Sequence, residues 1–308
     1  MSAARTEAEI EVGGKRLKVS NLQKVLYPKV GFTKADVINY YIRVAPVLLP
    51  HLKNRALTLK RYPNGVDGPF FYEKRCPPHR PAWVKTAAIW SEGNNANINF
   101  CLANDLPTLV WAANLADLEL HTYLGLAKTP LKPTMLVFDL DPGPPATIVE
   151  CCQVGLWLRA LFTKWDLDCF AKTSGSKGLQ LYVPLNTATT FDKTKTFAHE
   201  LAERLEREHS ELVVLRMLKS LRQGKILVDW SQNDDHKTTI CAYSLRAKER
   251  PTVSTPVTWQ EVERCLQKKS PELLVFDTEA VLKRVERDGD LFAPVLRQKQ
   301  KLPRSALS

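Results

Sequence analysis

Alternation between polar and apolar residues is the first pattern in the chain. Residues 9–19 alternate around Gly13-Gly14, which predicts a hairpin at a sheet edge. Residues 34–52 repeat their apolar positions at helical spacing after Thr33, a suitable N-cap. Because proline lacks an amide hydrogen, we expect Pro46 and Pro50 to break this helix.

Shorter apolar runs continue the pattern and predict strands and helices. In the first third, strand-like runs cover residues 56–62 and 70–74, so this part reads as mixed α and β. The middle then alternates: strand 135–141, helix 147–164, strand 169–173, strand 179–185, helix 192–209 and strand 226–229. The basic segment 294–308 is typical of a flexible tail or linker.

Charge and length narrow the function classes. The 308 residues suffice for one large domain or two average ones. Forty-four Lys and Arg against 33 Asp and Glu give a net charge of +11, which favours a polyanionic partner. No apolar stretch is long enough to span a membrane and no secretory signal opens the chain, so we expect a cytoplasmic protein.

The cysteines and histidines do not indicate a zinc site. None of the seven cysteines forms a C-x-x-C pair, and the six histidines lack zinc-ligand spacing. Most of the cysteines lie in apolar runs, which predicts buried, reduced thiols.

Asp139 and Asp141 end the apolar run 135–141. Alternate residues of a strand share a face, so both carboxylates would point one way while Phe138 and Leu140 enter the core. Two carboxylates spaced about 7 Å apart suit a pair of divalent cations of the kind used in phosphoryl or nucleotidyl transfer. A polar strand end that runs into a Pro-Gly turn is the alternative.

The turn 173–178 offers hydroxyls, backbone amides and Lys177 between two strands. Such a loop can bind phosphates, although it lacks Walker A spacing, and an ordinary polar hairpin turn is the alternative. Gln180 follows on the strand and would share the face of the loop's ligand.

Two further charges would join the site. Asp229 ends an apolar strand, where a carboxylate needs a metal, a hydrogen bond or a salt bridge to Arg222 or Lys225. Arg246 can bind a triphosphate bidentately, or it is a surface charge.

Basic residues form two clusters. Arg216, Lys219, Arg222 and Lys225 recur at every third position and would make a positive stripe if the segment is helical. Lys60 and Arg61 lie near Phe70, Phe71 and Tyr72, a mixture that suits stacking on exposed bases and also a half-buried hairpin.

These pieces together resemble the polymerase domain of bacterial DNA ligase D, in the archaeo-eukaryotic primase superfamily. The resemblance covers about residues 20–290 and rests on six ordered blocks: 21–28, 60–66, 137–141, 173–179, 228–233 and 242–246. It implies one catalytic primase-polymerase domain over residues 1–293, of mixed α/β class. Its antiparallel-rich central sheet would carry the catalytic carboxylates and be flanked by helices.

The resemblance also implies site residues. Asp139, Asp141 and Asp229 would be catalytic and hold two metal ions, Mn²⁺ or Mg²⁺. The NTP or dNTP would be bound by His121, Ser174, Lys177, Gln180, Arg222 and Arg246, and the DNA by Lys24, Lys34, Lys60, Phe71 and Tyr72. Among the latter, Lys24 and Lys34 would hold a 5′-phosphate while the two aromatic residues stack against the template.

The implied activity is template-directed nucleotide addition at DNA gaps or broken ends, in double-strand break repair by non-homologous end joining. Ku and the ligase and nuclease modules would be partners, and the protein would be nucleoid-associated. The family pattern S-x-x-K-G-L-H has Gln180 in its last position here, so we expect a weaker reaction. The alternatives are a catalytically impaired end-binding module and a metal-dependent nuclease.

Overall fold

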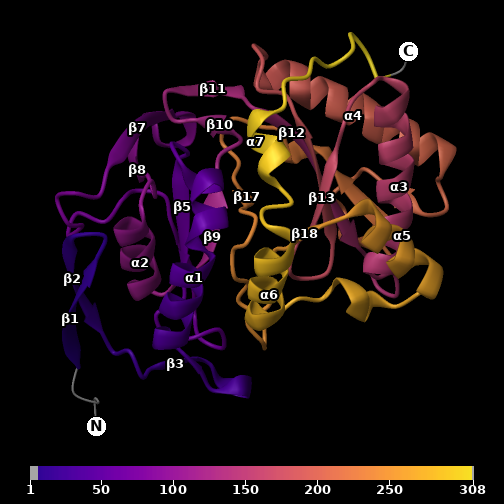
Figure 1. Ribbon diagram of the computed structural model, residues 1–308. Helices are drawn as coiled ribbons and strands as arrows, with labels where there is room; N and C mark the ends of the chain where they lie inside the picture. The colour runs from indigo at the N-terminus through magenta and orange to yellow at the C-terminus, as the bar shows by residue number, and fades with distance from the viewer. Residues whose placement is uncertain (1–5, 307–308) are drawn as a thin grey trace.

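The computed structural model describes residues 6–306 and has two halves, each built on a sheet (Figure 1). The indigo to magenta half contains most of one sheet, and the magenta to yellow half contains the other. Both are six-stranded and are accompanied by helices. The mixed α+β class predicted from the sequence is therefore confirmed.

The N-terminal sheet is antiparallel throughout. Its order is β17 (Thr239–Ile240), β9 (Asp117–Thr122), β5 (Leu57–Arg61), β8 (Ala96–Cys101) and β7 (Thr86–Ser91), with β6 (Phe71–Glu73) paired to β5. The predicted strands 56–62 and 70–74 are present, each shorter by one residue at both ends.

Helices α1 (Lys34–Leu52) and α2 (Leu106–Asn114) pack together beside this sheet. Thr33 caps α1 as predicted, because its side chain accepts from the Asp36 amide. The predicted break at Pro46 and Pro50 is wrong, since α1 runs through both. Burial of its apolar face in the core outweighs the two lost amide donors.

Short hairpins surround the two sheets. They are β1 (Glu7–Val12) with β2 (Lys15–Ser20), β3 (Val25–Tyr27) with β4 (Phe32–Thr33), and β10 (Gly125–Leu126) with β11 (Thr129–Pro133). The first confirms the predicted hairpin, although it forms a two-stranded sheet of its own and not the edge of a six-stranded sheet. Both glycines of its turn, Gly13 and Gly14, have positive φ.

Cys76 and Cys101 form a disulfide, which corrects the expectation of reduced thiols throughout. The Cys76 amide donates to the Asn99 carbonyl at 2.7 Å, so the chain after β6 runs beside the end of β8 and brings the two thiols together. Spacing along the chain could not reveal this contact. The other five cysteines are free and buried, as predicted.

The C-terminal sheet has the order β15 (Val213–Val214), β16 (Ile226–Asp229), β12 (Met135–Pro142), β14 (Leu179–Pro184), β13 (Phe170–Thr173) and β18 (Pro256–Val257). Only the β15–β16 pair is parallel, so the predicted antiparallel-rich sheet is confirmed. Helices α3 (Ile148–Lys164), α4 (Phe191–Glu208) and α5 (Trp259–Lys268) lie beside it in Figure 1.

Alternation along β12 decides which side chains reach the site. Phe138 and Leu140 are buried in the core that this sheet forms with α3 and α4, as the sequence predicts. Val137 points the other way, into the core shared with the N-terminal half. Asp139 and Asp141 lie on this second face.

The C-terminal segment is packed, in contrast to the expected flexible tail. After α6 (Thr278–Asp288), the short helix α7 (Ala293–Arg297) begins just before the predicted tail and extends into it. Gln300 donates to the Pro184 carbonyl at 2.9 Å and to the Asp168 carbonyl at 3.0 Å, and Ala306 is fully buried. Side-chain hydrogen bonds and apolar residues between the basic positions hold it in place.

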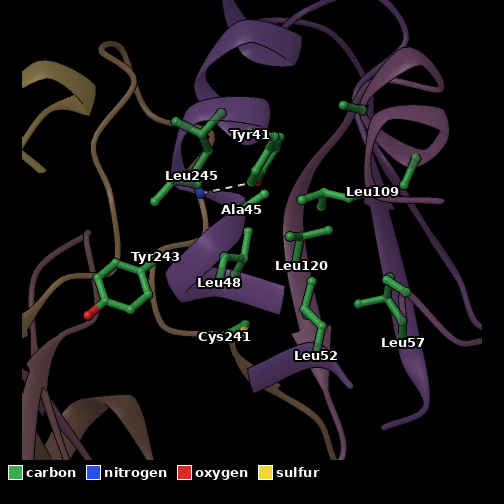
Figure 2. Close-up of a cluster of buried hydrophobic side chains, with 14 of the residues drawn as sticks. Tyr41, Ala45, Leu48, Leu52, Leu57, Leu109, Leu120, Cys241, Tyr243 and Leu245 are labelled. Carbon is green, nitrogen blue, oxygen red and sulfur yellow. Dashed lines mark hydrogen bonds between the residues drawn. The ribbon is translucent and has the colours of Figure 1, made fainter. Parts of the chain in front are cut away.

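A buried cluster joins α1 to the segment after β17 (Figure 2). Tyr41 accepts a hydrogen bond from the Leu245 amide at 3.2 Å and donates to the Leu118 carbonyl at 2.8 Å. Tyr40 donates to the Tyr243 carbonyl at 2.8 Å. These bonds fix the backbone immediately before Arg246. Among the described helices, none is long and apolar enough to cross a membrane.

Candidate active site

Cross-strand register brings three polar residues into one row. Asp139 on β12 lies opposite Gln180 on β14 and opposite Asp229 on β16. Asp141 lies two residues further along the same face, opposite Leu227. Three strands distant in sequence therefore present two carboxylates and an amide at one level of the sheet, with the third carboxylate beside them.

Charges in this row repel one another. Burial, and then the neighbouring charges of Asp141 and Asp229, raise the pKa of Asp139 to about 7. Burial and Asp229 also raise the pKa of Asp141, although Arg222 and Arg246 oppose the shift. Clustered carboxylates with raised pKa values are typical of functional sites.

Among the described residues, hydrogen bonds satisfy Asp229 but not a buried oxygen of Asp139. Asp229 accepts from the Ser231 amide at 2.9 Å, the Ser231 hydroxyl at 2.6 Å and the Gln232 amide group at 2.8 Å. These partners, rather than Arg222 or Lys225, satisfy it. The Oδ1 atom of Asp139 is buried and has no hydrogen-bond partner among residues 6–306.

An unpartnered carboxylate oxygen among three carboxylates suits a hard divalent cation, which prefers oxygen ligands. The three aspartates therefore fit the expected metal ions. Within residues 6–306, only Asp234, Asp235 and His236 gather three ligand atoms inside 4.8 Å, and there Lys195 already pairs with Asp234. Asp139, Asp141 and Asp229 are spread more widely along the sheet.

Lys172, which sequence reasoning missed, continues the row. It lies opposite Gln180 and is fully buried, and its ammonium group donates to Gln180 Oε1 and to Ser254 Oγ, both at 2.6 Å. Burial lowers the pKa of Lys172 to about 7, against the opposing charge of Asp139. The sequence signal that could have revealed Lys172 was a lysine inside an otherwise apolar strand, next to the strand that carries Gln180.

The turn after β13 is held by hydrogen bonds from its own backbone to the Ser174 side chain. The Ser174 hydroxyl accepts from the Ser176 amide at 3.2 Å and from the Gly178 amide at 3.1 Å. Gly178 is required here because a Cβ would lie 2.1 Å from the Leu140 carbonyl oxygen. The turn therefore approaches β12 closely, and the exposed Lys177 is near enough to lower the pKa of Asp141.

Arg246 joins the two halves. Tyr27 donates to its carbonyl at 3.1 Å, while its guanidinium group donates to the Ser174 carbonyl and lies 3.3 Å from Glu119 on β9. The alternative of a surface charge is thus wrong. The arginine is largely buried between the turn and the N-terminal sheet.

His121 lies on β9 beside Arg246. Its Nε2 is 3.1 Å from Oε2 of Glu119. Sequence reasoning missed Glu119, for which the signal was a charged residue on the His121 face of a buried strand.

Arg222 reaches the site from a loop rather than from a helix. The basic segment contains only a 3-10 turn, Lys219–Leu221, so the predicted helical stripe is absent from it. Gly143 permits the packing of this loop, because a Cβ there would lie 1.8 Å from the Arg222 carbonyl oxygen. The Arg222 charge lowers the pKa of Asp141 against the effect of burial.

Lys24 and Lys34 share a basic cavity of about 650 Å³ on the N-terminal half. Lys24 donates to Asn64 Oδ1 at 3.0 Å and Lys34 to the Asn114 carbonyl at 2.9 Å. Further basic residues line it: Arg16, Lys18, Arg61 and His79. The cavity has the charge to bind a phosphate group.

The β5–β6 hairpin presents aromatic residues to solvent. Phe71 is 43% exposed and Tyr72 is 56% exposed. Lys60 is different, because its ammonium group lies 3.1 Å from Glu119 and 4.5 Å from the Phe70 ring centre. The Lys60 side chain therefore packs against the aromatic rings instead of extending into solvent.

Comparisons with known proteins identify the family of the chain. Residues 33–292 match the family model described as LigD, primase-polymerase domain. The multifunctional non-homologous end joining protein LigD of Mycolicibacterium smegmatis is 40% identical over 284 residues, which are 91% of this chain. The bifunctional LigD of Bacillus subtilis is 34% identical over 293 residues, or 95% of this chain.

A solved structure shares the fold. The polymerase domain of Mycobacterium tuberculosis ligase D, in complex with DNA, matches with a TM-score of 0.84 and 37% identity. The match covers 92% of this chain and 99% of that one. The chain spans 36% of the length of the M. smegmatis relative and 46% of the B. subtilis relative. On the family model and these relatives, the chain belongs to the LigD primase-polymerase domain family.

Proposed function

We propose that this chain is a metal-dependent, template-directed nucleotidyltransferase. It would add ribo- or deoxyribonucleotides at DNA gaps or broken ends that carry a 5′-phosphate. The observation that carries the proposal is the register of the C-terminal sheet, which pairs Asp139 with both Asp229 and Gln180. Membership of the LigD primase-polymerase family supports the same reaction class.

In this proposal Asp139, Asp141 and Asp229 would hold two divalent ions, Mn²⁺ or Mg²⁺. When bound, such ions lower the pKa of an attacking 3′-hydroxyl and neutralise charge on the triphosphate. The proposal is supported by the unpartnered Oδ1 of Asp139 and by the mutual repulsion of the three carboxylates.

The residues around the carboxylates would bind the nucleotide. Lys177 and Arg222 carry positive charge close enough to lower the pKa of Asp141, and Arg246 does the same. They would bind the triphosphate and stabilise the negative charge that develops on it. Ser174 orders the turn, and Gln180, which takes the place of the family histidine, offers an amide donor beside Asp139.

DNA would lie across the N-terminal half. Lys24 and Lys34 would bind the 5′-phosphate in the basic cavity, while Phe71 and Tyr72 would stack on template bases. The M. smegmatis and B. subtilis relatives are named as non-homologous end joining proteins, so we place this domain in double-strand break repair. Ku and the ligase and nuclease modules are the proposed partners.

Primer extension on a gapped duplex with a 5′-phosphate tests the proposal. The reaction would contain Mn²⁺ and either ribo- or deoxyribonucleotides, and we expect template-matched primer lengthening. Asp139→Asn is the matched control, because it keeps the side-chain shape and removes the charge.

Three outcomes of this assay distinguish a polymerase, an end-binding module and a nuclease. Lengthening by the parent and loss in the control support the polymerase. Retention of the duplex with neither lengthening nor shortening indicates an end-binding module. Metal-dependent shortening of the primer indicates a nuclease.

A further inference from the structure

Glu119 is a buried carboxylate on β9 that contacts residues from several segments. It is 1% exposed, and both of its oxygens have partners. Oε2 lies 3.1 Å from Lys60 Nζ and 3.1 Å from His121 Nε2. Oε1 accepts from the Ala247 amide at 3.0 Å and lies 3.3 Å from Arg246 Nε.

The carboxylate of Glu119 is ionised in this setting. Burial would raise its pKa, but the hydrogen bond from His121 and the charges of Arg246 and Lys60 hold the pKa well below its usual range. An ionised carboxylate has no proton to donate, so every group around Glu119 must act as the donor.

That requirement fixes the tautomer of His121. Its Nε2 must carry the proton that bonds to Glu119. Burial lowers the pKa of His121, which favours a neutral ring despite the opposing effect of Glu119. A neutral ring protonated at Nε2 has a lone pair at Nδ1, which accepts a hydrogen bond from a sugar hydroxyl or another donor.

Glu119 also orients Arg246. The two groups form an ion pair, with Nε 3.3 Å from Oε1 and no hydrogen bond between these atoms, while the other end of the guanidinium group donates to the Ser174 carbonyl in the turn after β13. Because the guanidinium group is planar and always charged, the buried Glu119 carboxylate holds it beside the Ser174 turn by charge attraction.

Through Lys60, the Glu119 carboxylate also contacts the aromatic residues of the β5–β6 hairpin. Lys60, held by Glu119, lies over the rings of Tyr62, Phe70 and Tyr72, at 5.4, 4.5 and 5.5 Å from their centres. The Tyr72 ring in turn meets the His121 ring edge to face, with 5.9 Å between centres. One buried charge therefore links the aromatic hairpin to the nucleotide residues.

We propose that Glu119 is a positioning residue for the incoming nucleotide: it holds His121 with Nδ1 as an acceptor and directs Arg246 toward the Ser174 turn. The inference rests on the proposed function of this site. It assigns to Glu119 a role in nucleotide affinity that acts through its two partners.

Glu119→Gln tests this role, because it keeps the shape but removes the charge and places an amide donor against other donors. Glu261→Gln is the matched control, since Glu261 also pairs with an arginine, Arg284, and neither residue is among those assigned to the nucleotide. The first readout is the ¹⁵N spectrum of His121 in metal-free protein labelled on histidine. We expect the Nε2-protonated form in the parent and in the control, and loss of that preference in Glu119→Gln.

The second readout is calorimetric binding of ATP with Mn²⁺ in the absence of DNA. We expect Glu119→Gln to bind about tenfold more weakly than the parent, the effect of losing charge-assisted hydrogen bonds. Binding of a gapped duplex with a 5′-phosphate should change less than twofold, because Lys24 and Lys34 are untouched.

An Nδ1-protonated His121 in the parent would overturn the proposal, even if no substituted protein folds. Unchanged ATP affinity in a folded Glu119→Gln protein would overturn it too. Failure of the parent to bind ATP would instead contradict the proposed function, while the ¹⁵N spectrum still reports on Glu119 and His121. Glu119→Asp, which retains the charge on a shorter side chain, should keep the tautomer while weakening ATP binding.

Discussion

Asp139 and Asp229 lie opposite each other on adjacent antiparallel strands, and in residues 6–306 no group bonds to Oδ1 of Asp139. The site thus concentrates negative charge that the protein itself does not fully neutralise. Both the reaction and the stability of the domain should depend on that charge.

Replacing Asp139 by asparagine should lower primer extension by roughly 100-fold or more, because an amide is a poor ligand for a divalent ion. The same change should leave the fold intact or stabilise it in EDTA, since it removes repulsion from Asp141 and Asp229. Extension rates and thermal unfolding measure the two effects. Full activity in the substituted protein would refute the metal assignment.

Stability should depend on pH through Asp139. Its pKa is about 7 in the folded protein, against 3.8 for an ordinary aspartate, so the folded state binds the proton more tightly. The contribution is present below pH 3.8 and is lost as the pH rises to about 7. In EDTA, the Tm of the parent relative to Asp139→Asn should fall across this window and then level off. A constant difference would contradict the prediction.

Restoring the family histidine by Gln180→His should raise the extension rate several-fold. An imidazole can accept from Lys172 through one nitrogen and donate through the other, where Gln180 now accepts from Lys172 and lies opposite Asp139. Single-turnover extension with Mn²⁺ measures the change. Gln180→Ala serves as the control and should be slower than the parent, so an unchanged rate in both proteins would count against this role.

Gly178→Ala should displace the turn after β13, because the new Cβ would lie 2.1 Å from the Leu140 carbonyl oxygen. We expect a loss of about 3 kcal/mol in the free energy of unfolding and weaker ATP binding. Gly93→Ala is the control, since a Cβ there meets no atom within 4 Å. Urea unfolding of the two proteins should separate them, and equal stability would exclude the close contact.

Lys24→Ala should reduce the preference for a 5′-phosphate at a gap by about tenfold, by removing one charge from the basic cavity. Fluorescence anisotropy with phosphorylated and unphosphorylated duplexes measures this preference. Lys283→Ala on α6 removes an exposed charge outside the cavity and should leave the preference unchanged. A preference that survives Lys24→Ala would place the phosphate elsewhere.

Local pattern determined much of this protein. Period-two alternation located β12 and put Asp139 and Asp141 on one face, because a strand's side-chain direction depends only on its own sequence. Thr33 likewise revealed the start of α1, since capping is a contact between near neighbours. The ordered blocks also indicated the family before any contact was known.

Only the tertiary structure decided which distant residues meet. Register across three strands set Asp229 and Gln180 beside Asp139, and Lys172 entered the row through β13. Packing also kept α1 whole through its prolines. Glu119 shows the reason most clearly. Its role depends on Lys60 and Arg246, which reach it from other segments, and no pattern along one strand encodes the free energy of such contacts.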